Sequence, residues 1–534
     1  MSPDPQLIRE AGRRRTFAII SHPDAGKTTL TEHLLLLGGA VREAGAVRAR
    51  KAQRHATSDW LEIERQRGIS VSSSVMYFEY NGLRVNILDT PGHRDFSEDT
   101  YRTLVAADSA VMLIDAAKGV EAQTRKLFEV CRLRGIPIFT FVNKMDRVGR
   151  EPIDLVDEIE DVLGVEAAPA QWPIGSGSGF RGVYDRVAER LLLFPSDEST
   201  SDESTGLREV PGRPDAPEIR AAIGRHAHAL VDALALLDGA GGRFDPVAIR
   251  AGRQTPVFFG SALRGKGVAP FLERFLELAP APGPRPTDRG VVEPTERGFS
   301  GFVFKIQANM DPSHRDRVAF VRVCSGRFVR GETAVHVQTG TRIRLARSTL
   351  FQARARDEVD EAWPGDVVGL FDPGIFRIGD TLSTEGGFAY RPLPTFSPEC
   401  FVEIELGAVS NRKALAKGLD QLTQEGLVQR FHEARGGLAT VLGAVGGLQF
   451  DVLRHRLRTE YRVDLALQPL PFEFARWPAA PLDPEVFRWN DNVKVLADRD
   501  GRPVVLFRSR WDLERAEHKH PELRLSPTPD AGDP

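Results

Sequence analysis

The sequence predicts a multidomain chain of three folding units: an α/β unit on a parallel sheet, a β-barrel, and an α+β unit of ferredoxin-like order. Up to about residue 280, short apolar runs alternate with helical patterns, which is typical of a parallel sheet covered by helices. A proline-rich segment, 279–287, then marks a boundary because it cannot continue a helix. Beyond it, alternating strands with frequent glycine turns predict a small barrel.

The third unit begins near residue 401, where the order of elements becomes strand, helix, strand, strand, helix and strand. This is the order of the ferredoxin-like split β-α-β fold. Two further strands and a helix near 511–518 form a C-terminal extension. We expect the domains to span 1–280, with an insertion at about 150–250, then 281–392 and 393–534.

The bulk composition is that of an ordinary globular protein, with 41% hydrophobic and 27% charged residues among 534. The net charge of -3 does not by itself indicate a protein that binds nucleic acid, although basic residues gathered on one face could still bind RNA. Cys131, Cys324 and Cys400 are isolated, so neither a zinc site nor a disulfide framework is predicted. No run approaches the roughly 18 apolar residues of a membrane helix, nor is there a signal peptide, so we expect a cytoplasmic protein without membrane contact.

The first strand and the turn after it, 16–29, carry the strongest motif. An apolar run, 17–20, leads into a polar turn, after which leucines at helical spacing begin. Backbone N–H groups of such a turn and the start of the helix bind a polyphosphate. In this pattern Lys27 reaches the outer phosphates and Thr28 offers its hydroxyl to Mg²⁺. The alternative is a structural turn that carries Gly-Lys-Thr by chance. The candidate residues are Ser21, which replaces the pattern's first glycine, and His22, Pro23, Asp24, Ala25, Gly26, Lys27, Thr28 and Thr29.

A second candidate phosphate site follows the predicted strand 83–88. The strand ends in Asp89, and Thr90, Pro91, Gly92 and His93 come next. Asp89 is placed to hold the Mg²⁺ shell through a water molecule, while the Gly92 amide can contact a terminal phosphate.

Two later turns point to a guanine base. The strands 110–115 and 137–142 follow in order, and the second ends in Asn143, Lys144, Met145 and Asp146. A carboxylate accepts from both N1–H and the 2-amino group of guanine, which adenine lacks, and such a site rejects a misfit by roughly 10⁴-fold. Lys144 can pack its stem along the base, and Asn143 can tie this loop to the phosphate loop. After the strand 256–259, the backbone of Ser261, Ala262 and Leu263 can contact the guanine O6.

These motifs follow the carboxyl ends of predicted strands, where doubly wound sheets bind ligands. Together they resemble the P-loop GTPases, and within them the translational GTPases, at 24–28, 67–70, 89–93 and 143–146. The resemblance implies GTP/GDP and Mg²⁺ as ligands, Ser70 as a further metal ligand, and His93 as the residue that orients the attacking water. A capping role after the turn is the alternative for His93. The implied catalytic residues are His93, Gly92, Lys27 and Asp24.

The order of the domains distinguishes among the families of translational GTPases. Elongation factor Tu-like proteins carry a second barrel, and elongation factor G-like proteins need further domains, for which the roughly 140 residues after the barrel leave no room. The chain resembles the bacterial peptide chain release factor 3 family along nearly its whole length, for example at 301–323 and 445–457. This implies a ribosome-dependent, monomeric GTPase that promotes dissociation of class I release factors after peptide release. The ribosome, with its RNA and proteins, and the class I factors are the implied partners.

Two alternatives stay open at this point. The chain could be a nucleotide-gated ribosome-binding module of an elongation factor G-like type, in which hydrolysis is incidental, or a P-loop metabolic enzyme. The basic stretch Arg42–Arg54 is either a solvated loop or an RNA contact, and it belongs to the expected moving half of the switch, 42–70. The glycine-rich segment 175–179 is predicted to be a loop, and the SDEST repeat at 196–205 a low-complexity acidic segment.

Overall fold

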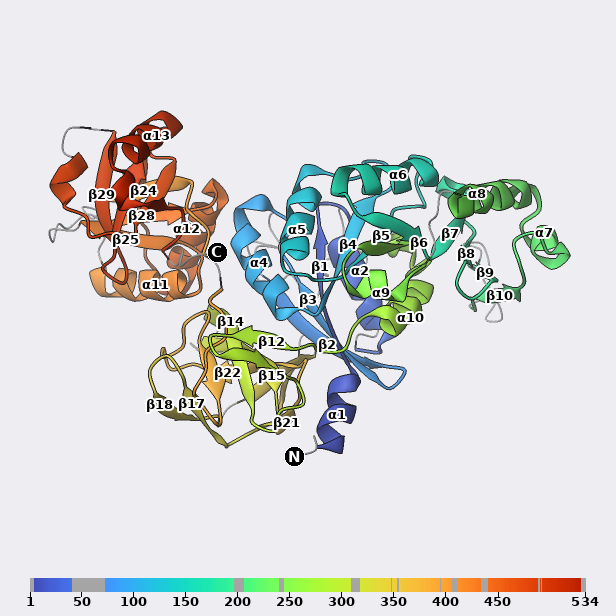
Figure 1. The fold of residues 1–534 in the computed structure, drawn as a ribbon, viewed down its shortest axis with the longest axis horizontal. Coiled ribbons are helices and arrows are strands. Elements are labelled where there is room, and N and C mark those ends of the chain that lie inside the picture. Colours follow the sequence, from blue (N-terminus) through green and yellow to red (C-terminus); the bar gives the residue numbers. More distant parts are fainter. Residues whose placement is uncertain are drawn as a thin grey trace.

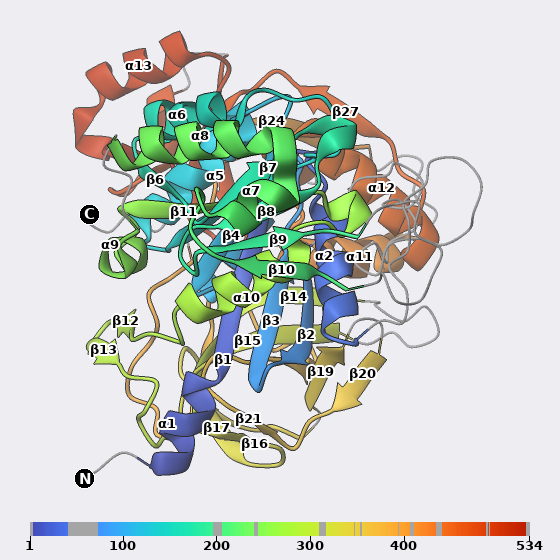
Figure 2. The same cartoon turned by 90° about the vertical axis from the view of Figure 1, so that its right-hand side faces the viewer.

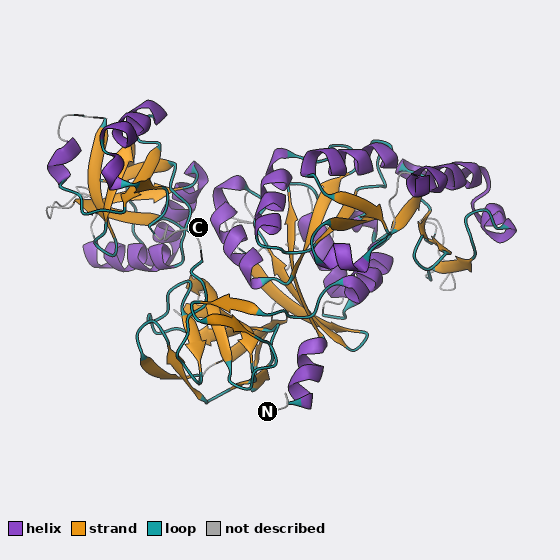
Figure 3. Ribbon diagram, viewed as in Figure 1, coloured by secondary structure: helices purple, strands orange, loops and turns teal. Residues whose placement is uncertain are grey.

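The computed structural model describes residues 4–40, 73–195, 206–239, 244–308, 317–346, 348–352, 355–393, 395–405, 411–433, 440–487, 490 and 492–529. Figure 1 shows three bodies, with the barrel and the third domain lying beside the first domain. Coloured by secondary structure, the barrel consists of strands, whereas helices flank the sheets of the other two domains (Figure 3).

The first domain is built on a seven-stranded sheet with the order β2-β3-β1-β4-β5-β11-β6. All neighbouring pairs are parallel except β2, which runs antiparallel to β3. Every strand expected from an apolar run is present, and two strands that were not predicted, β2 and β6, form the edges. The strands are β1 (Arg14–Ser21), β2 (Ser74–Tyr80), β3 (Leu83–Asp89), β4 (Ser109–Asp115), β5 (Ile138–Asn143), β6 (Glu166–Pro169) and β11 (Gln254–Phe259).

Helices cover both faces of this sheet. Alternate residues of a strand face opposite sides, and in these strands the residues on both sides are apolar, so both faces are buried. Phe17 and Ile19 of β1 pack in the core that includes α2 and α10, whereas Ala18 and Ile20 pack in the core under α4, α5 and α6. Strands buried on both faces read as continuous apolar runs, which is why they were predictable. The helices are α1 (Pro5–Gly12), α2 (Lys27–Leu37), α4 (Ser97–Ala106), α5 (Ala122–Leu133), α6 (Pro152–Leu163) and α10 (Val268–Leu278).

The insertion starts later than the expected residue 150. α6 and β6 belong to the main fold, because β6 pairs in parallel with β11. Beyond β6 lies a separate four-stranded antiparallel sheet of order β10-β9-β8-β7, with helices beside it (Figure 2). Segment 175–179 is a loop with a single 3₁₀ turn, as predicted, and the SDEST repeat lies outside the described residues. The elements are β7 (Gln171–Ile174), β8 (Gly182–Asp185), β9 (Arg190–Leu193), β10 (Arg208–Pro211), α7 (Pro217–Ile223), α8 (Ala227–Gly239) and α9 (Pro246–Arg250).

The second domain is a β-barrel whose main sheet has the order β18-β17-β23-β14-β15-β22-β19-β20. Its core contains Val303 and Ile306 from β14 and Val321 and Val323 from β15. The predicted alternation of strands and glycine turns is confirmed. The strands are β12 (Arg285–Thr287), β13 (Gly290–Val292), β14 (Ser300–Ala308), β15 (Arg317–Ser325), β16 (Phe328–Val329), β17 (Thr333–His336), β18 (Thr341–Arg344), β19 (Ser348–Gln352), β20 (Ala355–Glu358), β21 (Glu361–Ala362), β22 (Val367–Phe371) and β23 (Thr381–Ser383).

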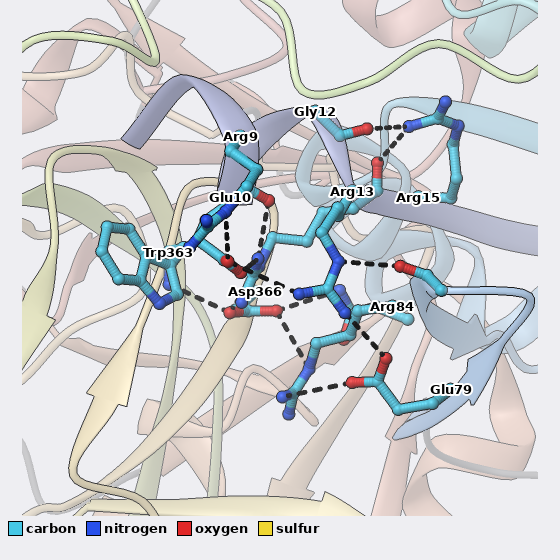
Figure 4. A network of polar contacts seen from close by, with 12 residues as sticks. Arg9, Glu10, Gly12, Arg13, Arg15, Glu79, Arg84, Trp363 and Asp366 are labelled. Atoms are coloured by element: carbon cyan, nitrogen blue, oxygen red, sulfur yellow. Dashed lines mark hydrogen bonds and ion pairs between the residues drawn. The ribbon is translucent and has the colours of Figure 1, made fainter. Parts of the chain in front are cut away.

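A buried carboxylate joins the barrel to the first domain (Figure 4). Asp366, which precedes β22, accepts hydrogen bonds from Arg14 Nε at 2.8 Å and from the Trp363 backbone N–H at 2.9 Å. Arg84 Nε lies 3.3 Å from its other oxygen. The preceding Gly365 has a φ of 106°, and a Cβ there would lie 2.6 Å from Pro282 Cγ, so this close approach requires glycine.

Asp108 forms a second connection between the same two domains. Its two carboxylate oxygens lie 2.9 Å from Arg285 Nη2 and 2.6 Å from Arg322 Nη2, and both arginines belong to the barrel. Arg285 also donates to the carbonyl oxygens of Val105 and Ala107 at the end of α4. Buried ion pairs from two separate places therefore hold the barrel against the first domain.

The third domain has an eight-stranded sheet of order β27-β24-β26-β25-β29-β30-β28-β31. Its first four strands have the predicted ferredoxin-like arrangement, and α11 and α12 pack on them through Leu419, Leu453 and Leu457. The pairing of β25 with β29 joins the C-terminal extension to this sheet. The sequence predicted neither β28 nor β31. The elements are β24 (Cys400–Ile404), α11 (Arg412–Gln424), β25 (Gln429–Glu433), β26 (Thr440–Ala444), α12 (Gly447–Tyr461), β27 (Leu467–Leu470), β28 (Phe474–Pro478), β29 (Val493–Asp498), β30 (Pro503–Phe507), α13 (Arg510–Lys519) and β31 (Leu525–Ser526).

Candidate active site

The four sequence motifs meet at one edge of the main sheet. They follow β1, β3, β5 and β11, whose carboxyl ends lie at the same edge because these strands are parallel. The loops after β5 and β11 touch directly, since the Met145 N–H donates to Gly260 O at 3.1 Å. The fold therefore assembles one site from segments that lie far apart in the sequence.

The loop after β1 is a tight turn with two residues in the left-handed region, Asp24 with a φ of 67° and Gly26 with a φ of 99°. A Cβ on Gly26 would also lie 2.3 Å from Asn143 Nδ2, so both the backbone and its neighbour require glycine. Gly26 is the N-cap of α2 and provides no side-chain hydrogen bond to the helix. The first amides of α2 are therefore suited to bind an anion.

Ser21, at the position of the missing glycine, is 1% exposed, and its hydroxyl has no hydrogen-bond partner within the described part of the chain. A buried hydroxyl without a partner is costly in free energy. The position of this hydroxyl at the end of β1, next to the phosphate loop, fits a site that a polar ligand completes.

Lys27 and Asp89 form a buried ion pair, with Nζ and Oδ1 2.6 Å apart and side chains that are 7% and 1% exposed. The two residues come from the phosphate loop and from the end of β3, so the two predicted phosphate sites are in contact. Next to them, Thr90 Oγ1 donates to Ile19 O at 2.7 Å. This bond fixes the loop after β3 against β1.

The residues expected to hold Mg²⁺ fit the ion chemically, because the Thr28 hydroxyl and the Asp89 carboxylate are oxygen donors. No cluster of three or more His, Cys, Asp or Glu side chains that could hold a metal exists among the described residues. Mg²⁺ usually binds to one or two protein ligands together with phosphates and water, so a small protein donor set suits it. Ser70, the third expected ligand, lies outside the described residues, as do Arg42–Arg54.

His93 follows Gly92 and is half-buried. Its Nδ1 accepts the backbone N–H of Asp95 at 3.2 Å and so caps the short helix η1 (Arg94–Phe96). The capping role considered from the sequence is therefore present in the structure. It occupies only one ring nitrogen, and Nε2 is the atom that a catalytic role would use.

The candidate base site joins the loops after β5 and β11. Asn143 Nδ2 donates to Ala25 O at 2.8 Å, and its Oδ1 accepts the Ala262 N–H at 2.8 Å. The first bond is the tie to the phosphate loop that the sequence suggested. Ser261 Oγ donates to Asp146 Oδ1 at 2.6 Å, which fixes the orientation of the carboxylate expected to select guanine.

The sequence did not indicate Asp115 as a site residue, although it ends β4 at the same edge of the sheet. Lys144 Nζ donates to Asp115 Oδ2 at 2.7 Å and to Asp24 O at 2.6 Å, so Asp115 fixes the lysine across the phosphate loop. Burial acts to raise the pKa of Asp115, but hydrogen bonds from Lys144 and the Ala117 N–H outweigh it and lower the pKa. The carboxylate therefore stays ionised beside Lys144.

Three further contacts have no local signal in the sequence. His22 Nδ1 lies 3.1 Å from a carboxylate oxygen of Glu121, which is the N-cap residue of α5. Ser73, the first described residue after 41–72, donates from its N–H and its hydroxyl to Asp99 Oδ2 at 2.7 and 2.6 Å. Lys305 of the barrel donates to the Ser73 carbonyl oxygen. The barrel thus contacts the main chain that leads back from the expected switch.

Three family models match consecutive parts of the chain. The model described as elongation factor Tu GTP binding domain matches residues 12–281, and elongation factor G domain 2 matches residues 298–385. The model described as class II release factor RF3, C-terminal domain, matches residues 390–517. These ranges correspond to the first domain, the barrel and the third domain.

Full-length relatives decide the family. A protein named peptide chain release factor 3 from Symbiobacterium thermophilum is 55% identical over 528 residues, which cover 98% of this chain and 99% of the relative. The chain belongs to the peptide chain release factor 3 family. A second release factor 3 relative, from Gloeobacter violaceus, is 51% identical over 526 residues, which cover 98% of this chain and 98% of the relative. The release factor 3 family and the elongation factor Tu type of GTP-binding domain identify the chain as a translational GTPase.

A solved structure supports the fold of this release factor 3 family member. The crystal structure of a protein from Thermus thermophilus matches it with a TM-score of 0.69 and 25% sequence identity, over 86% of this chain and 69% of that one. The predicted fold class and family are thereby confirmed. Within the described residues, the structure contains no helix that is long and apolar enough to span a membrane.

Proposed function

We propose that this translational GTPase binds the ribosome in translation termination and promotes dissociation of class I release factors after peptide release, coupled to GTP binding and hydrolysis. The main support is the extent of the similarity. Both peptide chain release factor 3 relatives align with 98% of this chain, the third domain included. A GTP-binding domain alone would leave the kind of translational GTPase open, because one fold serves many functions.

The proposed substrate is GTP, with GDP as the bound product. The amides of the loop 21–29 would bind the phosphates, Lys27 would reach the outer ones, and the Gly92 amide would contact the γ-phosphate. Asp146, oriented by Ser261, would accept the guanine N1–H and 2-amino group. The stem of Lys144 would pack on the base.

The turn 261–263 completes the proposed nucleotide site by contacting the guanine O6 with its backbone. Thr28, Asp89 through a water molecule, and Ser70 would hold Mg²⁺. When bound there, the ion would neutralise negative charge on the phosphate oxygens.

His93 would orient the attacking water. Because its Nδ1 accepts the Asp95 N–H, the neutral ring carries its proton on Nε2 and presents a donor there. Such a donor can fix the oxygen of a water molecule and stabilise negative charge that develops beside it. Phosphoryl transfer depends mostly on positioning and charge stabilisation, so the ring does not need the pKa of a strong base.

The proposed partners are ribosomal RNA and proteins and the class I release factors on the same ribosome. We propose that the protein acts as a monomer in the cytoplasm, where these partners are.

The replacement His93→Ala tests the catalytic part of the proposal. We expect GTP affinity to remain and ribosome-stimulated turnover to fall by roughly 10²- to 10⁴-fold, the contribution typical of a positioned histidine. His228→Ala is the matched control, because the His228 side chain is 90% exposed on α8, away from the motif loops. Equal turnover in the two variants would exclude the role of His93.

Dissociation of a labelled class I factor from ribosomes after peptide release tests the biological part. We expect the wild-type protein with GTP to accelerate it. No acceleration would contradict the proposed function. Repeated rounds of recycling with a non-hydrolysable GTP analogue would show that hydrolysis is incidental, as in a nucleotide-gated module.

A further inference from the structure

The segment that directly follows His93 is held by the third domain. Asp95 is 7% exposed, and its Oδ2 accepts the Leu448 backbone N–H at 2.9 Å. Leu448 lies in the first turn of α12, a helix of 15 residues. A side chain of the first domain thus binds an N-terminal amide of a helix that belongs to another domain.

The N-terminus of α12 has the sequence that this contact requires. A cap side chain normally accepts the second or third amide of its helix, but the N-cap of α12 is Gly446, which has no side chain for this purpose. Asp95 provides the acceptor instead. A Cβ on Gly446 would lie 2.1 Å from Asp95 Cγ, whereas a Cβ on Gly447 would meet nothing within 4 Å. The φ of Gly446 is -151°, so it is the approach of Asp95, and not the backbone conformation, that requires glycine there.

The same short segment sets the orientation of His93. The Asp95 N–H donates to His93 Nδ1 at 3.2 Å, and Asp95 Oδ1 lies 3.4 Å from that nitrogen. The next residue, Phe96, is buried in a cluster with Val452 and Leu448 of α12. Asp95 and Phe96, which follow His93 in this turn, are therefore both held by α12, Asp95 through a hydrogen bond and Phe96 through apolar packing. If α12 moved away, this turn would lose the hydrogen bond that the Leu448 N–H donates to Asp95 and the apolar contact of Phe96 together.

We propose that Asp95 is a positioning residue for GTP hydrolysis: by capping α12 from outside its own domain, it makes the placement of His93 depend on the docking of the third domain. The proposal rests on the proposed role of His93 in ribosome-stimulated hydrolysis. Its distinctive element is the complementarity between Asp95 and Gly446, which are 351 positions apart in the sequence. Substitutions in the third domain, far from the nucleotide, should therefore change the chemical step.

The test compares two neighbouring glycines. In Gly446→Ala the new methyl group must displace the Asp95 carboxylate, so we expect kcat of ribosome-stimulated hydrolysis to fall roughly tenfold or more, within the range of coupling between contacting residues. Nucleotide affinity and the KM for ribosomes should stay within about twofold of wild type. Gly447→Ala should behave as wild type, because its methyl group has room.

Changes at Asp95 show whether the carboxylate carries the effect. Asp95→Ala keeps the backbone N–H that bonds His93 but also removes the carboxylate oxygen 3.4 Å from His93 Nδ1. Its loss of kcat therefore reports on the contact with α12 only when Gly446→Ala, which keeps the carboxylate, shows a loss as well. Asp95→Asn keeps one acceptor oxygen and should retain more activity. In the double variant Asp95→Ala, Gly446→Ala the added methyl group has space, so we expect no loss beyond that of Asp95→Ala alone. Hydrogen exchange at the Leu448 amide verifies that its bond is lost in Asp95→Ala.

The outcomes separate this inference from the proposed function. If ribosomes do not stimulate the wild-type protein, the proposed function fails, and the inference fails with it. If they do stimulate it but Gly446→Ala and Gly447→Ala have the same kcat, the inference alone is wrong. Faster exchange of the Leu448 amide in Asp95→Ala with unchanged kcat would also overturn it, because the contact would then be merely structural.

Discussion

Replacing Asp366 with alanine measures how strongly the buried network of Figure 4 joins the barrel to the first domain. Asp366 is 1% exposed, and the Arg14 side chain that donates to it is 5% exposed. In Asp366→Ala, Arg14 keeps Glu10 as a partner at 2.8 Å but loses its partner in the barrel. The Trp363 N–H loses its acceptor in the same step.

The magnitude follows from these contacts. Removing one partner of a buried ion pair costs about 3–5 kcal/mol, because a charge stays buried without its partner. The remaining Glu10 offsets part of this cost, whereas the buried Trp363 N–H without an acceptor adds about 1–3 kcal/mol. We therefore expect the interface to lose about 3–5 kcal/mol, which is a rise of roughly 10²- to 10⁴-fold in the population with the interface open.

Native-state hydrogen exchange of the turn 363–366 and of β1 measures this population. The matched control is Asp360→Ala, which removes a carboxylate from the same part of the barrel. Asp360 pairs with Arg330 at 2.8 Å, but its side chain is 80% exposed, and exposed pairs contribute only about 0–1 kcal/mol. If both variants exchange at the same rate and unfold at the same denaturant concentration, the buried network does not hold the domains together and the reasoning is refuted.

Three further predictions concern the nucleotide site. Asn143→Ala removes a bond to Ala25 O and the acceptor of the Ala262 N–H, each worth about 1–3 kcal/mol, so calorimetric titration should show GTP affinity lowered roughly tenfold or more. Asp146→Asn should exchange the preference for guanine over xanthine, measured by competition between GTP and xanthosine triphosphate; an intact preference would contradict base selection by this carboxylate. The lowered pKa of Asp115, below its ordinary 3.8, means that its stabilisation is complete above pH about 4 and is lost as the pH falls through the folded-state pKa. Acid unfolding of wild type and Asp115→Asn should therefore differ near pH 5 and converge once the pH falls below the folded-state pKa of Asp115; parallel curves would count against the link with Lys144.

The parts of the fold that were predictable from sequence have local causes. Buried parallel strands such as β4 and β5 are continuous apolar runs, and the barrel shows alternation with glycine turns. The missed strands are short or lie at an edge, and β6 and β28 both end in proline, which weakens a strand pattern. The start of the insertion was misplaced because no linker separates α6 and β6 from the strands that follow them.

The same distinction holds for the site. The sequence indicated Gly26, Lys27 and Asp146 as candidate site residues because their motifs keep fixed spacings within single loops. The partners that hold these loops were not indicated, because Asp115 and Ser261 act on residues 29 and 115 positions away. Contacts between domains left no local pattern at all, since a buried aspartate before a strand looks in sequence like any turn residue.

The join between β25 and β29 has a consequence for how the chain is made. Without β29, strand β25 would be an open edge of the ferredoxin-like sheet, with unpaired backbone groups that can recruit another chain. During synthesis that edge forms only after β26 (Thr440–Ala444), which pairs with β25, has emerged, and its cover, residues 493–498, follows later still. Once made, the C-terminal extension covers this edge, so a chain that stops between these two points would leave an unpaired edge of the kind that recruits other chains.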